Sequence, residues 1–391
     1  MGRKKEDALE QTSDDITSTT NISKDTLIDS LAKEVNNKFK SEGYKVAYFL
    51  QDGDSPSEVK EFISTGSTLL DLAISNRPNG GFPVGRITEI TGLEASGKSL
   101  LAAYALASTQ KQGGTAIFID TESAVSTEFL QVLGVDLSKL IYCPLETIED
   151  IFSVIESMIG SIRKNEDKRL ITIVVDSIAG ASTKTETATS YDKDGYATAK
   201  AIILSKSMRK ITNLISRERI CLILTNQLRQ KLNAMPFGDQ YTTSGGKAIA
   251  FHSSVRIRLS SVGKIKGKIN NLDSIIGIST KAQVIKNRIG PPNRDIRYDI
   301  FYTSGIDDSS SVFAMLVDIG IFKQGGNRYT YTDIDTGEEI KIAKKEFDEK
   351  FWNIPEMKDK LYKQLCDAYI LKYDTQKIKD IEVVQNLPEE E

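Results

Sequence analysis

The sequence is poor in the residues on which most zinc and disulfide chemistry depends. It has one histidine, His252, and three scattered cysteines in 391 residues. A histidine-based catalytic triad or a zinc centre therefore has almost no ligands, and no cysteine spacing predicts a disulfide framework. We expect His252 to be a packing residue, Cys143 and Cys221 to be buried structural thiols, and the surroundings of the protein to be reducing.

Long apolar runs are also missing. No stretch approaches the length that spans a bilayer, and the first residues are polar and charged, unlike a signal peptide. A content of 39% hydrophobic and 27% charged residues is typical of a soluble globular protein with one large core and a small satellite domain. The net charge of −3 does not indicate a nucleic-acid binder, so any such prediction must rest on local patterns.

A phosphate-binding loop is the most informative motif. Residues 92–99 match G-x-x-x-x-G-K-[ST], in which glycines let backbone N–H groups surround a phosphate. The expected nucleotide-binding residues are Gly92, Leu93, Glu94, Ala95, Ser96, Gly97, Lys98, Ser99 and Leu100. Lys98 would reach the β- and γ-phosphates, and the Ser99 hydroxyl would hold Mg²⁺. Taken alone, the pattern also fits an ordinary glycine-rich turn.

The flanking residues favour the phosphate-binding interpretation. Residues 85–91 alternate enough to predict a short strand, and residues 100–108 are good helix formers. Strand, loop and helix are the context that the motif requires, and the helix would direct its N-terminal dipole at the phosphates.

Two further apolar strands end in carboxylates. Residues 116–120 lead to Glu122, and residues 170–175 lead to Asp176. Strands of this kind are parallel and buried, and ligands lie at their carboxyl ends, so both acids are expected beside the phosphates. Asp176 suits a Mg²⁺-associated acid, and Glu122 is placed to orient and deprotonate the attacking water. Either acid alone could instead cap the turn that follows its strand.

A fourth strand, residues 220–225, is predicted to end in Asn226 and Gln227. A neutral amide at that position can bond a γ-phosphate and so report whether ATP or ADP is bound. Residues 228–244 lack apolar periodicity and predict a long loop, which in a compact domain is usually functional or disordered. Basic residues mixed with aromatics suit single-stranded nucleic acid, although a merely solvated loop is the alternative. The residues concerned are Arg229, Lys231, Phe237 and Tyr241, followed by Gly245 and Gly246.

A second concentration of positive charge lies further along the chain. Residues 263–268 carry three lysines and are expected to form a hairpin connection, and five more cations follow between residues 281 and 297. A solvated sheet edge is the simpler interpretation of this charge.

The chain is expected to contain five segments. They are a mobile tail (1–23), a detached helix and strand (24–61), an α/β ATPase core (62–308), a small α+β C-terminal domain (309–380) and an acidic tail (381–391). The detached helix covers residues 26–40 with one apolar stripe, and the strand covers residues 45–50. With little core of their own, they are expected to dock on a neighbouring subunit or, alternatively, in cis. The core sheet is expected to be mostly parallel, with an antiparallel edge over residues 253–302.

The motifs, taken in order, resemble the RecA family of recombinases, including its UvsX-like bacteriophage members. The resemblance covers roughly residues 25–360. The matching stretches are residues 63–71, 80–86, 92–99, 118–122, 174–177, 225–229, 242–246 and 284–288. Such an ordered set is far more specific than the phosphate-binding loop alone.

The resemblance implies roles at the nucleotide. Glu122 matches the catalytic glutamate, Gln227 matches the ATP sensor that reorganises the second DNA loop, and Phe129 matches the aromatic residue that stacks on adenine. Lys286 and Arg288 match two cations that reach the γ-phosphate of the neighbouring subunit's ATP. Bacterial members have lysine at the second of these positions, so Arg288 departs from the pattern while keeping the charge.

The resemblance also implies DNA contacts and polymerisation. Residues 190–197 occupy the first DNA loop, although their sequence matches poorly, and Ser205 and Arg209 lie on the helix that follows. The N-terminal helix and strand match the family's polymerisation element, which favours docking on a neighbouring subunit. The divergence of the first loop and of the C-terminal unit favours a viral member.

An ATP-dependent recombinase is the function that the resemblance implies. It would form a helical filament on single-stranded DNA, pair that strand with homologous duplex DNA and exchange strands, with DNA-stimulated hydrolysis of ATP to ADP and phosphate. ATP and Mg²⁺ are the implied cofactors, and single-strand-binding and mediator proteins are implied partners. The expected location is the cytoplasm of a bacterium or a phage-infected host, with no membrane partner.

Two other classes fit part of the sequence. Another RecA-fold motor, such as a hexameric replicative helicase or a clock-type ATPase, would keep Asp176 but lack Gln227 followed by the 242–246 motif. A non-enzymatic nucleotide-dependent scaffold would not need a water-activating acid such as Glu122.

Overall fold

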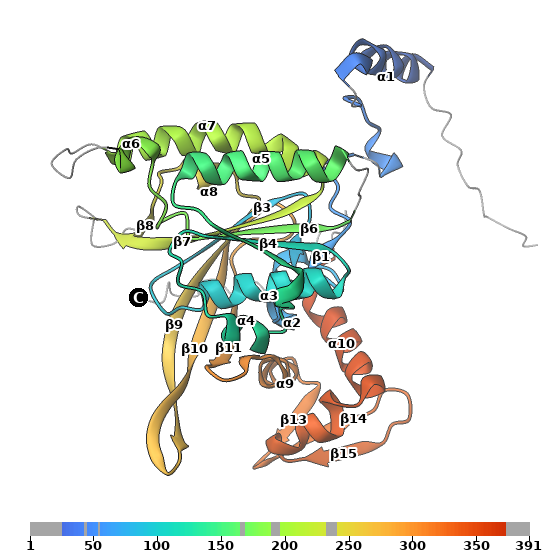
Figure 1. Cartoon of the computed structure of the whole chain (residues 1–391). Helices are drawn as coiled ribbons and strands as arrows, with labels where there is room; N and C mark the ends of the chain where they lie inside the picture. The colour runs from blue at the N-terminus through green and yellow to red at the C-terminus, as the bar shows by residue number, and fades with distance from the viewer. Residues whose placement is uncertain are drawn as a thin grey trace, which may run out of the picture. The chain divides into compact units, whose positions relative to one another are not determined.

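The computed structural model describes residues 26–42, 45–53, 55–164, 169–188, 196–231 and 241–372. The chain forms two compact units, residues 1–58 and 59–391, whose elements are labelled in Figure 1. Both predicted terminal tails, residues 1–23 and 381–391, lie outside the described residues. Within the described ranges, no helix is long and apolar enough to cross a membrane.

The N-terminal unit consists of helix α1 (Thr26–Lys38) and a segment that follows it. The apolar stripe of α1 is exposed at Leu27, Leu31 and Val35. The strand predicted over residues 45–50 is not formed, because this segment has no strand partner among the described residues. The Asn36 side chain instead accepts hydrogen bonds from the backbone N–H groups of Val46 and Ala47, both at 2.9 Å. An apolar segment becomes a strand only when a sheet edge can pair with it.

A ten-stranded sheet forms the core of the second unit, with the order β12–β11–β10–β9–β3–β7–β6–β4–β5, and β8 pairs with β7 outside this path. The pairs from β9 through β3, β7, β6 and β4 to β5 are parallel. Five of these parallel strands, in chain order, are β3 (Ile87–Gly92), β4 (Thr115–Asp120), β5 (Leu140–Pro144), β6 (Ile171–Asp176) and β7 (Ile220–Gln230). Long crossovers separate them in sequence, as parallel neighbours require.

Helices cover both faces of this sheet (Figure 1). Those on one face are α2 (Thr68–Ser75), α3 (Lys98–Lys111) and α4 (Thr127–Val132), and those on the other are α5 (Ile148–Lys164) and α7 (Tyr196–Arg217). Alternate residues of β6 belong to different cores, with Val174 on the α3 side and Ile173 on the α5 and α7 side. Because helices cover both faces of the sheet, the sequences of these strands are nearly continuous runs of apolar residues.

The predicted antiparallel edge is present and longer than expected. Its strands are β9 (Val255–Ile269), β10 (Leu272–Asn287), β11 (Arg294–Phe301) and β12 (Gly305–Asp307). The hairpin of β9 and β10 extends well beyond the rest of the sheet (Figure 1). Residues 263–268, predicted to be its connection, lie within β9, and the turn is formed by Asn270 and Asn271. Their φ angles are 50° and 66°, the left-handed pair that matches the twist of a tight hairpin.

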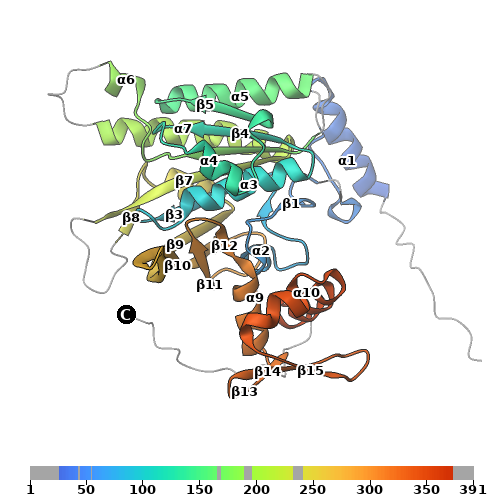
Figure 2. The ribbon, with the colours of Figure 1, turned by 60° about the horizontal axis from the view of Figure 1, so that its bottom comes forward.

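The last part of the second unit surrounds a small sheet. It contains α9 (Asp308–Asp318), β13 (Phe322–Gly325), β14 (Arg328–Thr332), β15 (Glu339–Ile342) and α10 (Pro355–Tyr369), and Figure 2 shows these elements together. This part of the chain therefore has the mixed helix and strand content that was expected of it. Aromatic rings fill the space between them, with Phe313 and Phe322 at 5.3 Å between centroids. The remaining strands and α-helices of the described residues are β1 (Phe62–Ile63), β2 (Phe82–Pro83), α6 (Lys184–Thr187), β8 (Tyr241–Thr243) and α8 (Ala248–His252).

Candidate functional site

The glycine-rich loop joins β3 to α3 in a conformation that few residues can adopt. Ala95 and Gly97 have φ angles of 54° and 94°. A Cβ added to Gly92 would lie 2.3 Å from Ser96 Oγ and 2.8 Å from the carbonyl oxygen of Leu259 on β9. The loop therefore packs against the neighbouring strand too closely for a side chain at its first position.

Two side chains of the loop turn back onto it. Ser96 Oγ and Lys98 Nζ donate to the Leu93 carbonyl at 2.8 and 2.7 Å. Burial lowers the pKa of Lys98, and the negative charges of Asp176 and Glu122 partly oppose that shift. The cation of the loop thus lies in the electrostatic field of the two acids that end neighbouring strands.

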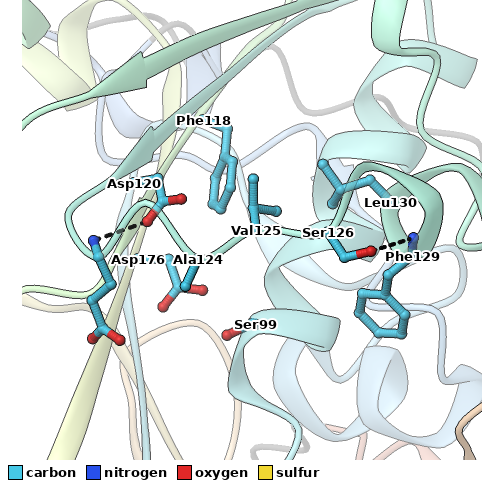
Figure 3. Close-up of a pocket in the computed structure, with 10 residues that line it drawn as sticks. Ser99, Phe118, Asp120, Ala124, Val125, Ser126, Phe129, Leu130 and Asp176 are labelled. Carbon is cyan, nitrogen blue, oxygen red and sulfur yellow. Dashed lines mark hydrogen bonds between the residues drawn. The ribbon is translucent and has the colours of Figure 1, made fainter.

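A cavity of about 240 Å³ lies beside the start of α3 (Figure 3). The predicted site residues that line it are Ser99, Glu122, Phe129 and Asp176, and the remaining lining residues are Phe118, Asp120, Ala124, Val125, Ser126 and Leu130. Figure 3 shows Ser99 at the start of its helix facing the carboxylates, and Phe129 on α4 at the opposite end. Strands β4 and β6 are adjacent, with Asp120 opposite Asp176, so the two strands deliver their carboxylates to the same edge of the sheet.

Hydrogen bonds fix the acids at the strand ends. Ser177 Oγ donates to Glu122 Oε1 at 3.0 Å, and Thr225 Oγ1 donates to Asp176 Oδ1 at 2.5 Å. Thr121 Oγ1 donates to the Ser177 carbonyl at 2.8 Å and accepts from the Ser177 amide at 3.1 Å. These hydroxyl residues are not among the predicted site residues, although each directly precedes or follows one of them or lies at a predicted strand end.

Gln227 lies near the same loop, but its strand is longer than predicted. In the parallel pairing of β3 with β7, Gln227 is opposite Gly92, the first residue of the loop. The strand does not end at Asn226: it continues to Gln230 and pairs with β8, so that Arg229 lies opposite Thr242. The region expected to be one long loop is therefore partly a hairpin, because backbone pairing does not require apolar periodicity.

A buried charge network that was not predicted from the sequence adjoins Gln227 along β7. Glu89 on β3 has no exposed surface, and it accepts hydrogen bonds from Arg256 Nε at 2.5 Å and Asn226 Nδ2 at 3.0 Å. Asn226 Nδ2 also donates to the carbonyl of Ser244 at 3.0 Å. The network therefore joins β3, β7, β9 and the 242–246 motif.

Lys286 and Arg288 are separate from the cavity. Lys286 Nζ donates to the carbonyls of Ala250 and Phe251 in α8, at 2.7 and 2.9 Å. Burial and the nearby charges of Arg288 and Arg256 lower the pKa of Lys286 to about 8. Neither side chain lines the cavity that holds Glu122 and Asp176.

Three predicted DNA-binding residues surround a second cavity, of about 470 Å³, between α7 and α8. Ser205, Arg209 and Gly245 line it together with Ala201, Lys247, Ala248, Phe251 and His252. Gly246 adjoins this cavity, since an added Cβ would lie 3.4 Å from Ala201 Cβ. The i, i+4, i+8 spacing of Ala201, Ser205 and Arg209 on one helix face is the sequence signal for this cavity. Of the remaining predictions, Phe237 and residues 190–195 of the first loop lie outside the described residues.

His252 and the cysteines have the surroundings of structural residues. His252 is partly exposed, with its ring Nδ1 3.0 Å from Thr212 Oγ1 and its ring edge against Phe251. Cys221 is buried and Cys143 is partly buried, and both are free thiols. In the described parts of the chain, no group of three or more histidine, cysteine or acidic side chains could hold a metal ion.

The fold and the cavity define a P-loop ATPase with an α/β core. The model of the RecA N-terminal domain matches residues 28–307. The protein RecA of Ehrlichia canis is 35% identical over 315 residues, covering 80% of this chain and 84% of that protein. Those of Ruegeria pomeroyi and Zymomonas mobilis are 35% and 33% identical, over 75% and 84% of this chain and 80% and 86% of their own lengths.

The chain belongs to the RecA family. It is a DNA recombinase that carries out ATP-dependent strand exchange, and a DNA-dependent ATPase. It binds ATP and single-stranded DNA and forms filaments. Family membership removes the replicative-helicase and scaffold alternatives.

Proposed function

We propose that the residues around the first cavity carry out ATP hydrolysis with the following division of roles. The backbone of residues 92–100 and the ammonium of Lys98 bind the phosphates, and Phe129 contacts the base. Glu122 orients and deprotonates the attacking water. The observation that carries this proposal is that Ser99, Glu122 and Asp176 line one cavity next to the glycine-rich loop.

Mg²⁺ fits the oxygen ligands at this site. The Ser99 hydroxyl and the Asp176 carboxylate line the same cavity, and Mg²⁺ prefers such hard oxygen ligands together with phosphate oxygens. When bound, the ion would neutralise charge on the phosphate oxygens. Thr225 would keep the Asp176 carboxylate oriented through the hydrogen bond at 2.5 Å.

Gln227 is proposed to sense the γ-phosphate. Its position opposite Gly92 places it beside the glycine-rich loop, and the strand that carries it continues directly into the Arg229 hairpin. A change at Gln227 is therefore transmitted along continuous backbone to the predicted DNA-binding residues. Lys286 and Arg288 would complete the site of a neighbouring subunit.

The second cavity is proposed to hold single-stranded DNA by its backbone. Arg209 and Lys247 supply positive charge, and Gly245 and Gly246 allow close approach of the phosphates. Arg229, Lys231 and Phe237 are proposed to extend this contact. Because the contacts are mainly to phosphates, sequence selection would come from base pairing with the duplex.

The outer segments have proposed roles in assembly. Helix α1 exposes Leu27, Leu31 and Val35, and residues 45–49 join no sheet among the described residues; both suit docking on a second copy of the chain. Residues 62–308 would be the catalytic core, and residues 309–380 a separate C-terminal domain. Single-strand-binding and mediator proteins are proposed partners, in the cytoplasm of a bacterial or phage-infected cell.

A substitution at Glu122 tests the catalytic proposal. Glu122→Gln should still bind ATP but hydrolyse it at least about a hundredfold more slowly, the scale of a general base. Glu128→Gln removes the same charge from α4, where Glu128 does not line the cavity, and should leave turnover unchanged. Steady-state ATPase of Glu122→Gln within a few-fold of wild type would remove Glu122 from this role.

A further inference from the structure

Lys200 lies in the second turn of α7, and its side chain is directed at the backbone of residues 179–181. The side chain is partly buried, and Nζ donates to the carbonyls of Ala179 and Ala181 at 3.1 and 2.5 Å. Burial lowers the pKa of Lys200. A lysine that is bound to two carbonyls in this way holds one segment of backbone against the helix.

The segment that Lys200 holds also positions Glu122. Ser177 Oγ donates to Glu122 at 3.0 Å and accepts from the Gly180 amide at 3.2 Å. A Cβ added to Gly180 would lie 3.0 Å from Glu122 Cγ, so the backbone there contacts the glutamate directly. Residues 177–181 therefore connect the Lys200 ammonium to the Glu122 carboxylate through a short, tightly packed turn.

The other end of this connection is the second cavity. Ala201 directly follows Lys200, and Ser205 and Arg209 lie on the next turns of the same helix, where all three line the cavity. Arg229 of the β7 hairpin is close enough for its charge to contribute to the lowered pKa of Lys200. Lys200 thus lies between the residues proposed to bind DNA and the residue proposed to activate water.

We propose that Lys200 is a positioning residue that couples DNA binding on α7 to the orientation of Glu122. DNA bound along Ala201, Ser205 and Arg209 shifts α7, Lys200 carries the shift to the carbonyls of Ala179 and Ala181, and Ser177 adjusts the carboxylate. This inference rests on the proposed role of Glu122 in hydrolysis. It makes DNA stimulation of the ATPase depend on a residue that contacts neither nucleotide nor DNA.

The test variant is Lys200→Met, which keeps the aliphatic bulk of the side chain but removes its ammonium group and so its hydrogen-bond donors. Its DNA-stimulated turnover number at saturating single-stranded DNA should fall by about tenfold, which corresponds to about 1.4 kcal/mol of lost transition-state stabilisation. DNA-independent turnover, and DNA affinity across a salt series, should stay within about twofold of wild type. The matched control is Lys206→Met, because Lys206 is exposed on the same helix.

A double-mutant cycle with Ser177→Ala tests the proposed route. If Lys200 acts through Ser177, the single variants should lose DNA stimulation to similar extents, and the double variant should be no slower than the slower single variant. Multiplicative losses in the double variant would overturn the route. Unchanged DNA stimulation in Lys200→Met would also overturn the proposal. A weaker DNA affinity of this variant, with a smaller slope of log affinity against log salt, would overturn it as well, because Lys200 would then be a phosphate contact.

Hydrogen exchange in the wild-type protein keeps the inference testable if Lys200→Met does not fold. Adding single-stranded DNA should change the exchange rate of the Gly180 amide, and an unchanged rate would overturn the inference. The Glu122→Gln assay separates this failure from that of the proposed function. Fast hydrolysis by Glu122→Gln would refute the proposed base, whereas slow hydrolysis with intact DNA stimulation in Lys200→Met would refute only the coupling.

Discussion

Asn226 donates a hydrogen bond from Nδ2 to Glu89 Oε1 at 3.0 Å, and Glu89 is fully buried. The same carboxylate pairs with Arg256, whose side chain is 19% exposed. Glu89 thus joins the strand that leads into the glycine-rich loop to the strand that carries Gln227. A buried charge is tolerated when it is paired and hydrogen-bonded, as Glu89 is here, although the buried Asn226 Oδ1 has no hydrogen-bond partner among the described residues.

Removing Glu89 should destabilise the fold. Glu89→Ala leaves Arg256 without its partner, and breaking a buried ion pair from one side costs about 3–5 kcal/mol. Urea unfolding at fixed protein concentration measures the free energy of unfolding, and Glu128→Ala, an exposed acid, should change it by less than about 0.5 kcal/mol. A loss of under about 1 kcal/mol for Glu89→Ala would show that the pair contributes little net stability.

Neutralising the DNA-binding cations should weaken binding to unrelated single strands alike. Arg209→Gln and Arg229→Gln should each reduce the slope of log affinity against log salt by about 0.7, the value for one phosphate contact on a single strand. Lys210→Gln is the control, because Lys210 pairs with Glu156 instead. Unchanged slopes for both arginine variants would show that these side chains do not meet phosphates.

Arg288 should act in the active site of the neighbouring subunit. Arg288→Ala should leave the monomer folded and able to bind nucleotide weakly, but abolish DNA-stimulated ATPase. Mixed with Lys98→Ala subunits, it should regain some hydrolysis wherever a competent loop adjoins a competent Arg288. A mixing series at constant total protein tests this. If both variants co-assemble on DNA but ATP hydrolysis is not recovered at any mixing ratio, Arg288 is a structural cation of its own subunit.

Lys286 should make assembly sensitive to alkaline pH. Its pKa in the folded chain is lowered to about 8, first by burial and then by Arg288 and Arg256, with Glu89 opposing. The ammonium is therefore present below that pH and lost above it, so its attraction for a neighbour's γ-phosphate should weaken as the pH rises through about 8. The salt-matched pH profile of ATP-dependent assembly should flatten in Lys286→Arg, since arginine stays charged. An identical profile in that variant would exclude Lys286 as the cause.

The core could be predicted from sequence because its signals are local and agree with one another. Apolar runs define β3, β4 and β6, and turn residues at their carboxyl ends place Glu122 and Asp176 at one edge of the sheet. The Glu89 network was not predictable in this way. Its members come from β3, β7 and β9, and only the register of the folded sheet brings them together.

The errors have a common physical origin in strands that are not defined by burial. Residues 263–268, with their three lysines, were expected to form a hairpin connection, yet they lie in an exposed part of β9 where no face must be apolar. Their partner strand and the Asn270–Asn271 turn determine the pairing instead. The opposite error occurred at residues 45–50, where an apolar pattern predicts a strand but no partner edge lies among the described residues.

The strands of the sheet differ in whether they can accept an inserted residue. Inserting a single residue into β7 before Gln227 would turn every following side chain to the opposite face and remove the Gln227 amide from its place beside Gly92. The β9–β10 hairpin offers a site without this effect. Between residues 266 and 275 the hairpin is largely exposed, and among the described residues its two strands pair only with each other. Its tip at Asn270 and Asn271 is therefore the place to insert a fluorescent tag or an affinity peptide, with the catalytic frame of the sheet left unshifted.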